Sequence, residues 1–187
     1  SDYAQSSADP NHRYYHEGFP GQGISNPATH ASCKDLPNAN ELSWYAKYGD
    51  PRWDGDELWT TMGHLYKGGM WFKKKSVLQA EHHYDTEKSA DGTTDLRTTY
   101  KHYSNTNSSI YNSGLPDAAD ANNYFYLPAL GTYAYGGLNY VGDEGVYWSS
   151  SASLWNSGSA YVLDFYSDGI DVGVYGCDAG YRVGGFE

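Results

Sequence analysis

Two stretches near the C-terminus alternate large apolar residues with small or polar ones, the pattern of a β-strand with one buried face. Residues 160–165 place three large side chains on one face, Tyr161, Leu163 and Phe165, and leave Val162 and Asp164 on the other. Residues 170–175 place Ile170, Val172 and Val174 inward and leave Asp171, Gly173 and Tyr175 outward. The pattern predicts a sheet with one face for the core and one for a partner.

The strongest helix signal begins at Asn38. This residue can cap a helix, Glu41 completes a capping box three positions later, and Gly49 followed by Pro51 supplies the stop. The inward stripe of the predicted helix is Leu42, Tyr45 and Ala46, with Lys47 outward.

The same pattern recurs from Asp54, with Glu57 three positions later and Gly68–Gly69 as the stop. The apolar face of this second predicted helix is Leu58, Met62 and Leu65. The pattern predicts two capped helices that follow each other closely.

Strand signals dominate the rest of the chain. Residues 70–78 predict a strand whose lysine run, Lys73–Lys75, is typical of a protected sheet edge. Residues 124–127, closed by Pro128, predict another strand, and a glycine-punctuated tract follows. Two helices followed by strands predict an α+β fold.

The chain of 187 residues is long enough for one sizeable core, which predicts one domain. We expect residues 1–32 to form an irregular lead-in to it and residues 33–187 its body. A polar stretch near 79–113 predicts a long surface insertion. It would be held by four tyrosines, Tyr84, Tyr100, Tyr103 and Tyr111.

Composition and charge limit the kinds of partner that the protein can bind. The chain has 20 tyrosines and 6 tryptophans against 12 lysines plus arginines, and its net charge is -11. All basic residues except Arg182 lie at or before Lys101, so the second half repels phosphate and excludes a nucleic-acid partner. No apolar run approaches the roughly 20 residues that a membrane helix needs. We therefore expect neither nucleic acid nor membrane insertion, and tyrosine-rich surfaces are typical of binding proteins.

Cysteine and histidine offer weaker chemical signals. Cys33 and Cys177 would close one long loop as a disulfide in an exported protein, and two separate buried thiols are the alternative. His82 and His83 are adjacent, so they point apart on a strand or helix and have no spaced third ligand. We therefore expect exposed histidines and no metal or other cofactor.

The last third of the chain carries a family likeness in several short segments: Leu127-Pro128-Ala129, Gly131, Val141-Gly142, Gly145 to Ser151, Ala160 to Phe165, and Gly180 to Val183. These segments resemble C-type lectin-fold domains related to formylglycine-generating enzymes. More closely, they resemble the major-paralogous-domain (FISUMP) proteins and the variable proteins diversified by retroelements in gut bacteria and their phages. Cys33 to Leu42 is similar to the segment that opens the first helix in such domains. Cys177 and Gly184 stand where relatives commonly carry arginine.

The resemblance implies a C-type lectin-like fold with two helices, a small antiparallel sheet and long loops. It also implies a variable ligand-binding face built from residues 147–187. Carried onto this sequence, that face comprises Ala152, Leu154, Trp155, Asn156, Tyr166, Asp168, Asp171, Gly173, Tyr175 and Asp178.

Taken together, these observations predict a ligand-binding adhesin or receptor-binding domain with no enzymatic activity. Its partner would be a protein or a glycan on a cell surface. We expect a location at a pilus tip, with a phage particle as the alternative. A structural pilus or phage-tail subunit would use the same face for packing. An oxidase at Cys177 is the second alternative, although that chemistry needs a nearby second thiol and Cys33 is the only one in the chain.

Overall fold

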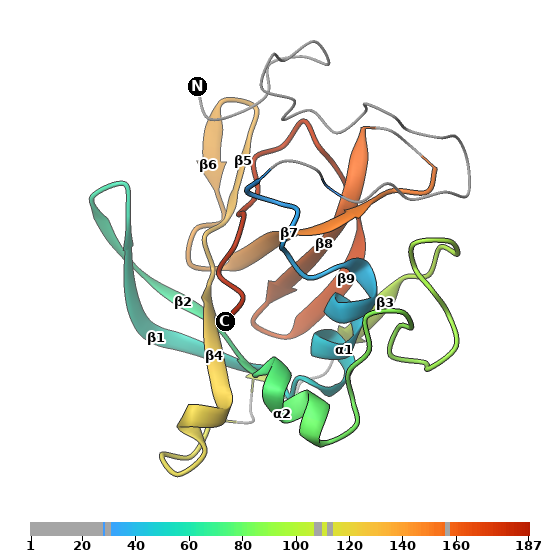
Figure 1. Cartoon of the computed structure of the whole chain (residues 1–187). Coiled ribbons are helices and arrows are strands. Elements are labelled where there is room, and N and C mark those ends of the chain that lie inside the picture. The colour runs from blue at the N-terminus through green and yellow to red at the C-terminus, as the bar shows by residue number, and fades with distance from the viewer. Residues whose placement is uncertain (1–27, 29–30, 107–109, 112–113, 156–157) are drawn as a thin grey trace.

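The computed structural model describes residues 28, 31–106, 110–111, 114–155 and 158–187. Within these ranges the chain forms three antiparallel sheets, two α-helices and one short 3-10 helix, which together make an α+β fold (Figure 1). Most of the lead-in at 1–32 lies outside the described residues.

A four-stranded sheet in the order β3-β9-β8-β7 forms the base of the fold. Its strands are β3 (Tyr103–Thr106), β7 (Glu144–Ala152), β8 (Ser159–Tyr166) and β9 (Gly169–Gly176). The two alternating stretches of the sequence are the centres of β8 and β9, which pair along their full length. Both strand predictions, with their inward residues, are confirmed.

A three-stranded sheet in the order β1-β2-β4 lies beside it. Its strands are β1 (Arg52–Thr61), β2 (His64–Lys73) and β4 (Tyr124–Pro128). The 3-10 helix Ala121–Asn123 leads into β4. The strand predicted over residues 124–127 and closed by Pro128 is confirmed as β4. A hairpin of β5 (Thr132–Ala134) and β6 (Gly137–Asn139) follows.

The core lies between the two larger sheets and the first helix, α1 (Ala39–Tyr48). As predicted, Asn38 and Glu41 form a capping box, and Leu42, Tyr45 and Ala46 are buried. These side chains meet residues of the other layers: Met70, Phe72, Phe125, Leu127, Tyr161, Leu163, Phe165, Ile170 and Val172.

The second helix predicted from Asp54 is wrong, because residues 52–73 form the β1–β2 hairpin. Asp54 Oδ1 does accept hydrogen bonds from the amides of Asp56 and Glu57, as a capping residue would, but it does so inside an irregularity of β1. Met62 and Gly63 form a two-residue turn with φ of 50° and 78°, which suits a hairpin.

The predicted apolar face of that helix is instead on the surface. Leu58, Met62 and Leu65 are 60%, 72% and 65% exposed. Only residues 69–73 of β2 also pair with β4, so the outer half of the hairpin is a two-stranded ribbon that projects from the body (Figure 1).

The strand predicted over residues 70–78 ends early. β2 stops at Lys73, and the second helix, α2 (Lys75–Ala80), begins two residues later. The edge-strand interpretation of the lysines is also wrong, because β2 is the central strand of its sheet. Lys73 instead pairs with Glu81 at 2.7 Å, and Lys75 pairs with Glu41 at 3.4 Å.

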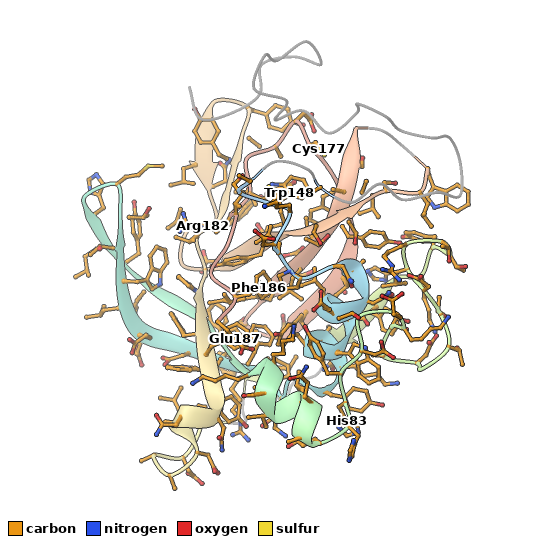
Figure 2. The ribbon with its side chains drawn as sticks, in the orientation of Figure 1. His83, Trp148, Cys177, Arg182, Phe186 and Glu187 are labelled. Atoms are coloured by element: carbon orange, nitrogen blue, oxygen red, sulfur yellow. The ribbon has the colours of Figure 1, made fainter. Side chains whose placement is uncertain are left out.

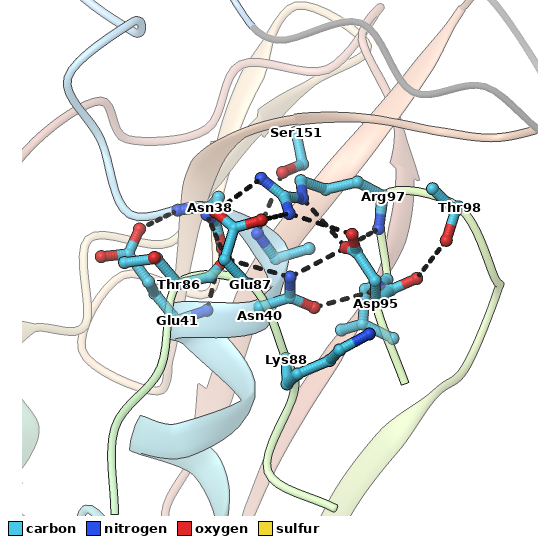
Figure 3. Close-up of polar contacts among 12 residues, drawn as sticks. Asn38, Asn40, Glu41, Thr86, Glu87, Lys88, Asp95, Arg97, Thr98 and Ser151 are labelled. Carbon is cyan, nitrogen blue, oxygen red and sulfur yellow. Dashed lines mark hydrogen bonds and ion pairs between the residues drawn. The ribbon is translucent and has the colours of Figure 1, made fainter. Parts of the chain in front are cut away.

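The polar stretch near 79–113 packs against α1 and contributes β3 to the four-stranded sheet. Leu96 and Ile110 are buried in the core. Asn40 of α1 binds the loop on both sides, since its Oδ1 accepts from the Leu96 amide and its Nδ2 donates to Asp95 and to the Thr86 carbonyl (Figure 3). Among the four tyrosines, Tyr84, Tyr100 and Tyr103 contact the body and Tyr111 is exposed.

Candidate ligand-binding face

The outer side of the four-stranded sheet brings three carboxyl groups together. Asp164 of β8 lies directly opposite Asp171 of β9, and Glu144 lies at the start of the neighbouring strand β7. Side chains directly opposite on antiparallel strands have Cβ atoms about 5 Å apart, where like charges repel. None of the Lys and Arg ion pairs that the structure records involves these three groups.

Two tyrosines hold the aspartates in a reciprocal arrangement. The Tyr166 hydroxyl of β8 donates to Asp171 Oδ2 at 3.2 Å. The Tyr175 hydroxyl of β9 donates to Asp164 Oδ2. Each strand therefore supplies the tyrosine that fixes the aspartate of the other strand.

The second oxygen of each aspartate receives no hydrogen bond from a tyrosine. Asp164 is only 2% exposed, and its Oδ1 is buried and has no hydrogen-bond partner while Glu144 is ionised. Asp171 Oδ1 is also buried and unpartnered. Buried acceptors without a donor cost free energy, so such a pair is a feature that a functional site explains better than packing does.

Burial and mutual repulsion hold protons on this face. Burial, then the charge of Asp164 and a hydrogen bond to it, raise the pKa of Glu144 to about 7. Burial raises the pKa of Asp164 to about 6; the Tyr175 hydroxyl opposes this rise and the Asp171 charge adds to it. Glu144 and Asp164 therefore share a proton near neutral pH and behave as a coupled pair.

Aromatic rings surround the carboxyl groups. Tyr181 packs on Trp148 with ring centroids 4.9 Å apart and on Tyr175 at 5.9 Å. Tyr181 lies in the segment that follows β9, where the Arg182 carbonyl accepts from the Trp148 amide. Figure 2 shows Cys177, Arg182, Phe186 and Glu187 following one another along this segment, with Trp148 beside it.

His102 covers one end of the face. Its Nε2 lies 3.6 Å from Asp171 Oδ1, beyond hydrogen-bond distance, and half of its side chain is exposed. The ring lies over Gly173, where a Cβ would make ordinary van der Waals contacts of 3.4 Å with His102 Cδ2 and 3.9 Å with the Tyr175 ring. The imidazole therefore packs against the sheet without a hydrogen bond to Asp171.

The structure brings some of the sequence-predicted site residues together. Tyr166, Asp171, Gly173 and Tyr175 lie on this outer face, with Asp168 exposed in the turn between β8 and β9. Asp178 is exposed two residues beyond the end of β9.

Three predicted residues do not join that face. Ala152 and Leu154 are 0% and 1% exposed, so neither is available to a ligand. Trp155 is 56% exposed, but its ring neighbour is Tyr100, which stacks on the inner-face residue Tyr161. Asn156 lies outside the described residues.

Sequence reasoning missed four residues of the site: Glu144, Asp164, Tyr181 and His102. The two-residue period did place Asp164 on the outer face, and its pairing with a second outward aspartate was a usable signal. Glu144 and Tyr181 arrive through β7 and the C-terminal segment, and His102 arrives from the insertion. These neighbours depend on tertiary pairing and are not readable from local sequence.

Within the described ranges, no group of three or more His, Cys, Asp or Glu side chains is arranged to hold a metal ion. His82 is exposed, and His83 stacks on Tyr48 with ring centroids 4.1 Å apart. Cys33 and Cys177 are free thiols, and burial, then the charges of Asp178 and Cys33, raise the pKa of Cys177 to about 12. A raised pKa lowers the population of the reactive thiolate.

Comparison of the chain with protein-family models, with curated proteins and with solved structures finds no significant match. Within the described part of the chain, no helix has the length and apolar character needed to cross a membrane.

Proposed function

We propose that this domain binds a ligand through its acidic face, defined as Glu144, Asp164 and Asp171 with the rings of Tyr166, Tyr175 and Tyr181. The observation that carries the proposal is the pair of buried aspartate oxygens that have no hydrogen-bond donor while Glu144 is ionised. Tyrosine rings beside them offer rigid contact area, and Tyr166 is 36% exposed at the rim.

The proposal includes the class of protein. A C-type lectin-like architecture of the retroelement-diversified kind accounts for the small antiparallel sheet, the helix packed on its inner face and the likeness of the last third of the sequence. In that class the domain is displayed on a cell surface, at a pilus tip or on a phage particle, and its partner is a protein or a glycan. It performs no catalysis.

One experiment tests this function. The full chain is screened against a glycan array and a phage-displayed random peptide library, and each hit is measured again with Tyr166→Ala and Tyr111→Ala. Both tyrosines are exposed, and within the described ranges no recorded contact joins Tyr111 to the acidic face. Removing an aromatic anchor from a binding site typically weakens affinity by about tenfold or more. We expect that loss for Tyr166→Ala alone, and equal losses in both variants would reject the acidic face as the site.

The exposed β1–β2 ribbon favours a second candidate, a structural subunit that packs on a neighbour. Leu58, Met62 and Leu65 form an apolar surface of the kind found at protein interfaces. Light scattering distinguishes the two functions. A packing role predicts an oligomer that dissociates in Leu58→Lys and persists in Tyr166→Ala.

A further inference from the structure

We infer that the acidic face recognises a cationic group, the ammonium or guanidinium of a lysine or arginine side chain on a protein ligand. This inference rests on the proposed function and names the chemistry of its ligand.

The charge of the face favours a cationic ligand. In the described part of the chain, the recorded side-chain contacts of these three carboxyl groups are with hydroxyl groups, with one another and with His102. The free oxygens at Asp164 and Asp171 accept hydrogen bonds and cannot donate while ionised. A ligand must therefore bring donors, and a cation brings donors and neutralises the repulsion at once.

The two aspartate Oδ1 atoms differ in how deeply they are buried and in which groups lie beside them. Asp164 Oδ1 is deep, and the protonated carboxyl of Glu144 is a neighbour that can share its proton with Asp164. The recorded neighbours of Asp171 are the Tyr166 hydroxyl, Asp164 and His102, and its side chain is 21% exposed. Asp171 is therefore the primary acceptor for the ligand, and Asp164 supplies charge behind it.

A ligand cation can reach Asp171 Oδ1 by displacing His102. His102 is the group that covers Asp171 Oδ1, and it does so at 3.6 Å with half of its side chain in solvent. A guanidinium that binds a carboxylate in two hydrogen bonds at once forms a stronger contact than this one. The ligand cation takes the place of the imidazole over Gly173, next to the ring of Tyr175. An aromatic ring beside a cation adds further attraction.

Small probes test the inference directly. The ¹⁵N-labelled full chain is titrated with Nα-acetyl-arginine amide, Nα-acetyl-lysine amide and Nα-acetyl-citrulline amide, followed by NMR. Citrulline has nearly the shape of arginine without its charge. We expect saturable shifts of the amides at 169–173 with the two cations, and binding of citrulline weaker by about tenfold. Equal binding of arginine and citrulline would overturn the inference, and this comparison needs no variant.

Three variants locate the contact. Asp171→Asn keeps the shape of the side chain and should weaken the arginine probe by about tenfold, whereas Asp120→Asn, an exposed acid before β4, should change nothing. His102→Ala uncovers Asp171 and should bind the arginine probe at least as tightly as the wild type. Unchanged affinity in Asp171→Asn, or loss of binding in His102→Ala, contradicts the proposed contact.

The outcomes separate this inference from the proposed function. If the array or library yields a neutral ligand that depends on Tyr166 while the cationic probes fail, the acidic face is a binding site for another chemistry and the inference is wrong. If neither screen nor probes give binding at this face, the proposed function fails with it.

Discussion

Asp164 and Asp171 face each other across β8 and β9, and each is held at Oδ2 by a tyrosine of the opposite strand. Opposed carboxylates are unfavourable in a sheet, and the β8 member of this pair is almost completely buried. The arrangement costs stability, which identifies it as a place where the sequence serves something other than folding.

Asp164→Asn should therefore stabilise the domain at pH 8. The substitution removes one of two opposed charges, its amide can donate to a neighbouring carboxylate, and the Tyr175 hydroxyl keeps an acceptor. We expect the free energy of unfolding in urea to rise by about 1 kcal/mol. A fall of that size would mean that the charge of Asp164 is compensated in the folded state.

Gly145→Ala should destabilise the domain strongly. A Cβ at this position would lie 2.7 and 2.8 Å from two ring atoms of Phe165, which is fully buried and stacked on Tyr147. Overpacking of this kind costs about 1–3 kcal/mol. Gly137→Ala is the matched control, since its Cβ would meet only the Ala134 carbonyl at 4.0 Å. Similar melting temperatures for the two variants would contradict this account of Gly145.

Asn40→Ala should release the insertion from α1. One side chain satisfies the Leu96 amide, the Thr86 carbonyl and the Asp95 carboxylate, and Asn40 is fully buried (Figure 3). Its loss leaves buried groups unpaired, at a cost of about 2–3 kcal/mol. Hydrogen exchange should accelerate across residues 86–98, while Lys88→Ala, an exposed change in the same loop, should leave protection intact.

Met62→Asn should stabilise the β1–β2 hairpin. Met62 has φ of 50° in a two-residue turn before Gly63, and asparagine adopts this left-handed conformation more readily than methionine. We expect a gain of about 0.5–1 kcal/mol in the free energy of unfolding. Met62→Val tests the same cause in the opposite direction, because a β-branched residue resists positive φ. A stabilised valine variant would reject the backbone explanation.

The sequence predicts the parts of this fold that local hydrogen bonds and periodicity decide. The capping box at Asn38 sets the start of α1, and two-residue alternation sets the faces of β8 and β9. It fails at Asp54, whose Oδ1 accepts from the amides of Asp56 and Glu57 inside β1, while β2 pairs with both β1 and β4. The side chain of Asp54 makes part of the capping pattern seen at Asn38, and sheet pairing nevertheless decides the structure here.

The candidate site divides in the same way. Asp171 and Tyr175 follow from alternation within one strand, so the sequence predicts them. The burial of Ala152 and Leu154 depends on how the chain leaves β7, where the register with β8 shifts. Glu144 lies on the face because β7 pairs with β8, and His102 lies there because the strand that follows it, β3, pairs with β9. No local sequence pattern predicts these pairings.

Stability should fall as pH rises from about 4.5 to about 7. The pKa values of Glu144 and Asp164 are raised to about 7 and about 6, from 4.5 and 3.8. In this window the folded state holds protons that the unfolded chain has released, so the stability that this pair contributes is complete below the unfolded pKa values and is lost above the folded ones. Because Glu144 is partly solvated, we expect a loss of about 1–2 kcal/mol rather than the full linkage value.

Asp95 acts in a different pH window. Hydrogen bonds and charge from Arg97 and Asn40 outweigh burial and lower the pKa of Asp95 to about 2, so its contribution is lost only under stronger acid. The test compares urea unfolding at pH 5, 6, 7 and 8 for wild type, Glu144→Gln and Asp120→Asn. Neither substitution alters His102, which lies beside Asp171, or the tyrosines of the face. The fall should be reduced in Glu144→Gln, whose amide can donate to Asp164 at every pH. A fall of equal size in Glu144→Gln and wild type would place the titrating group elsewhere.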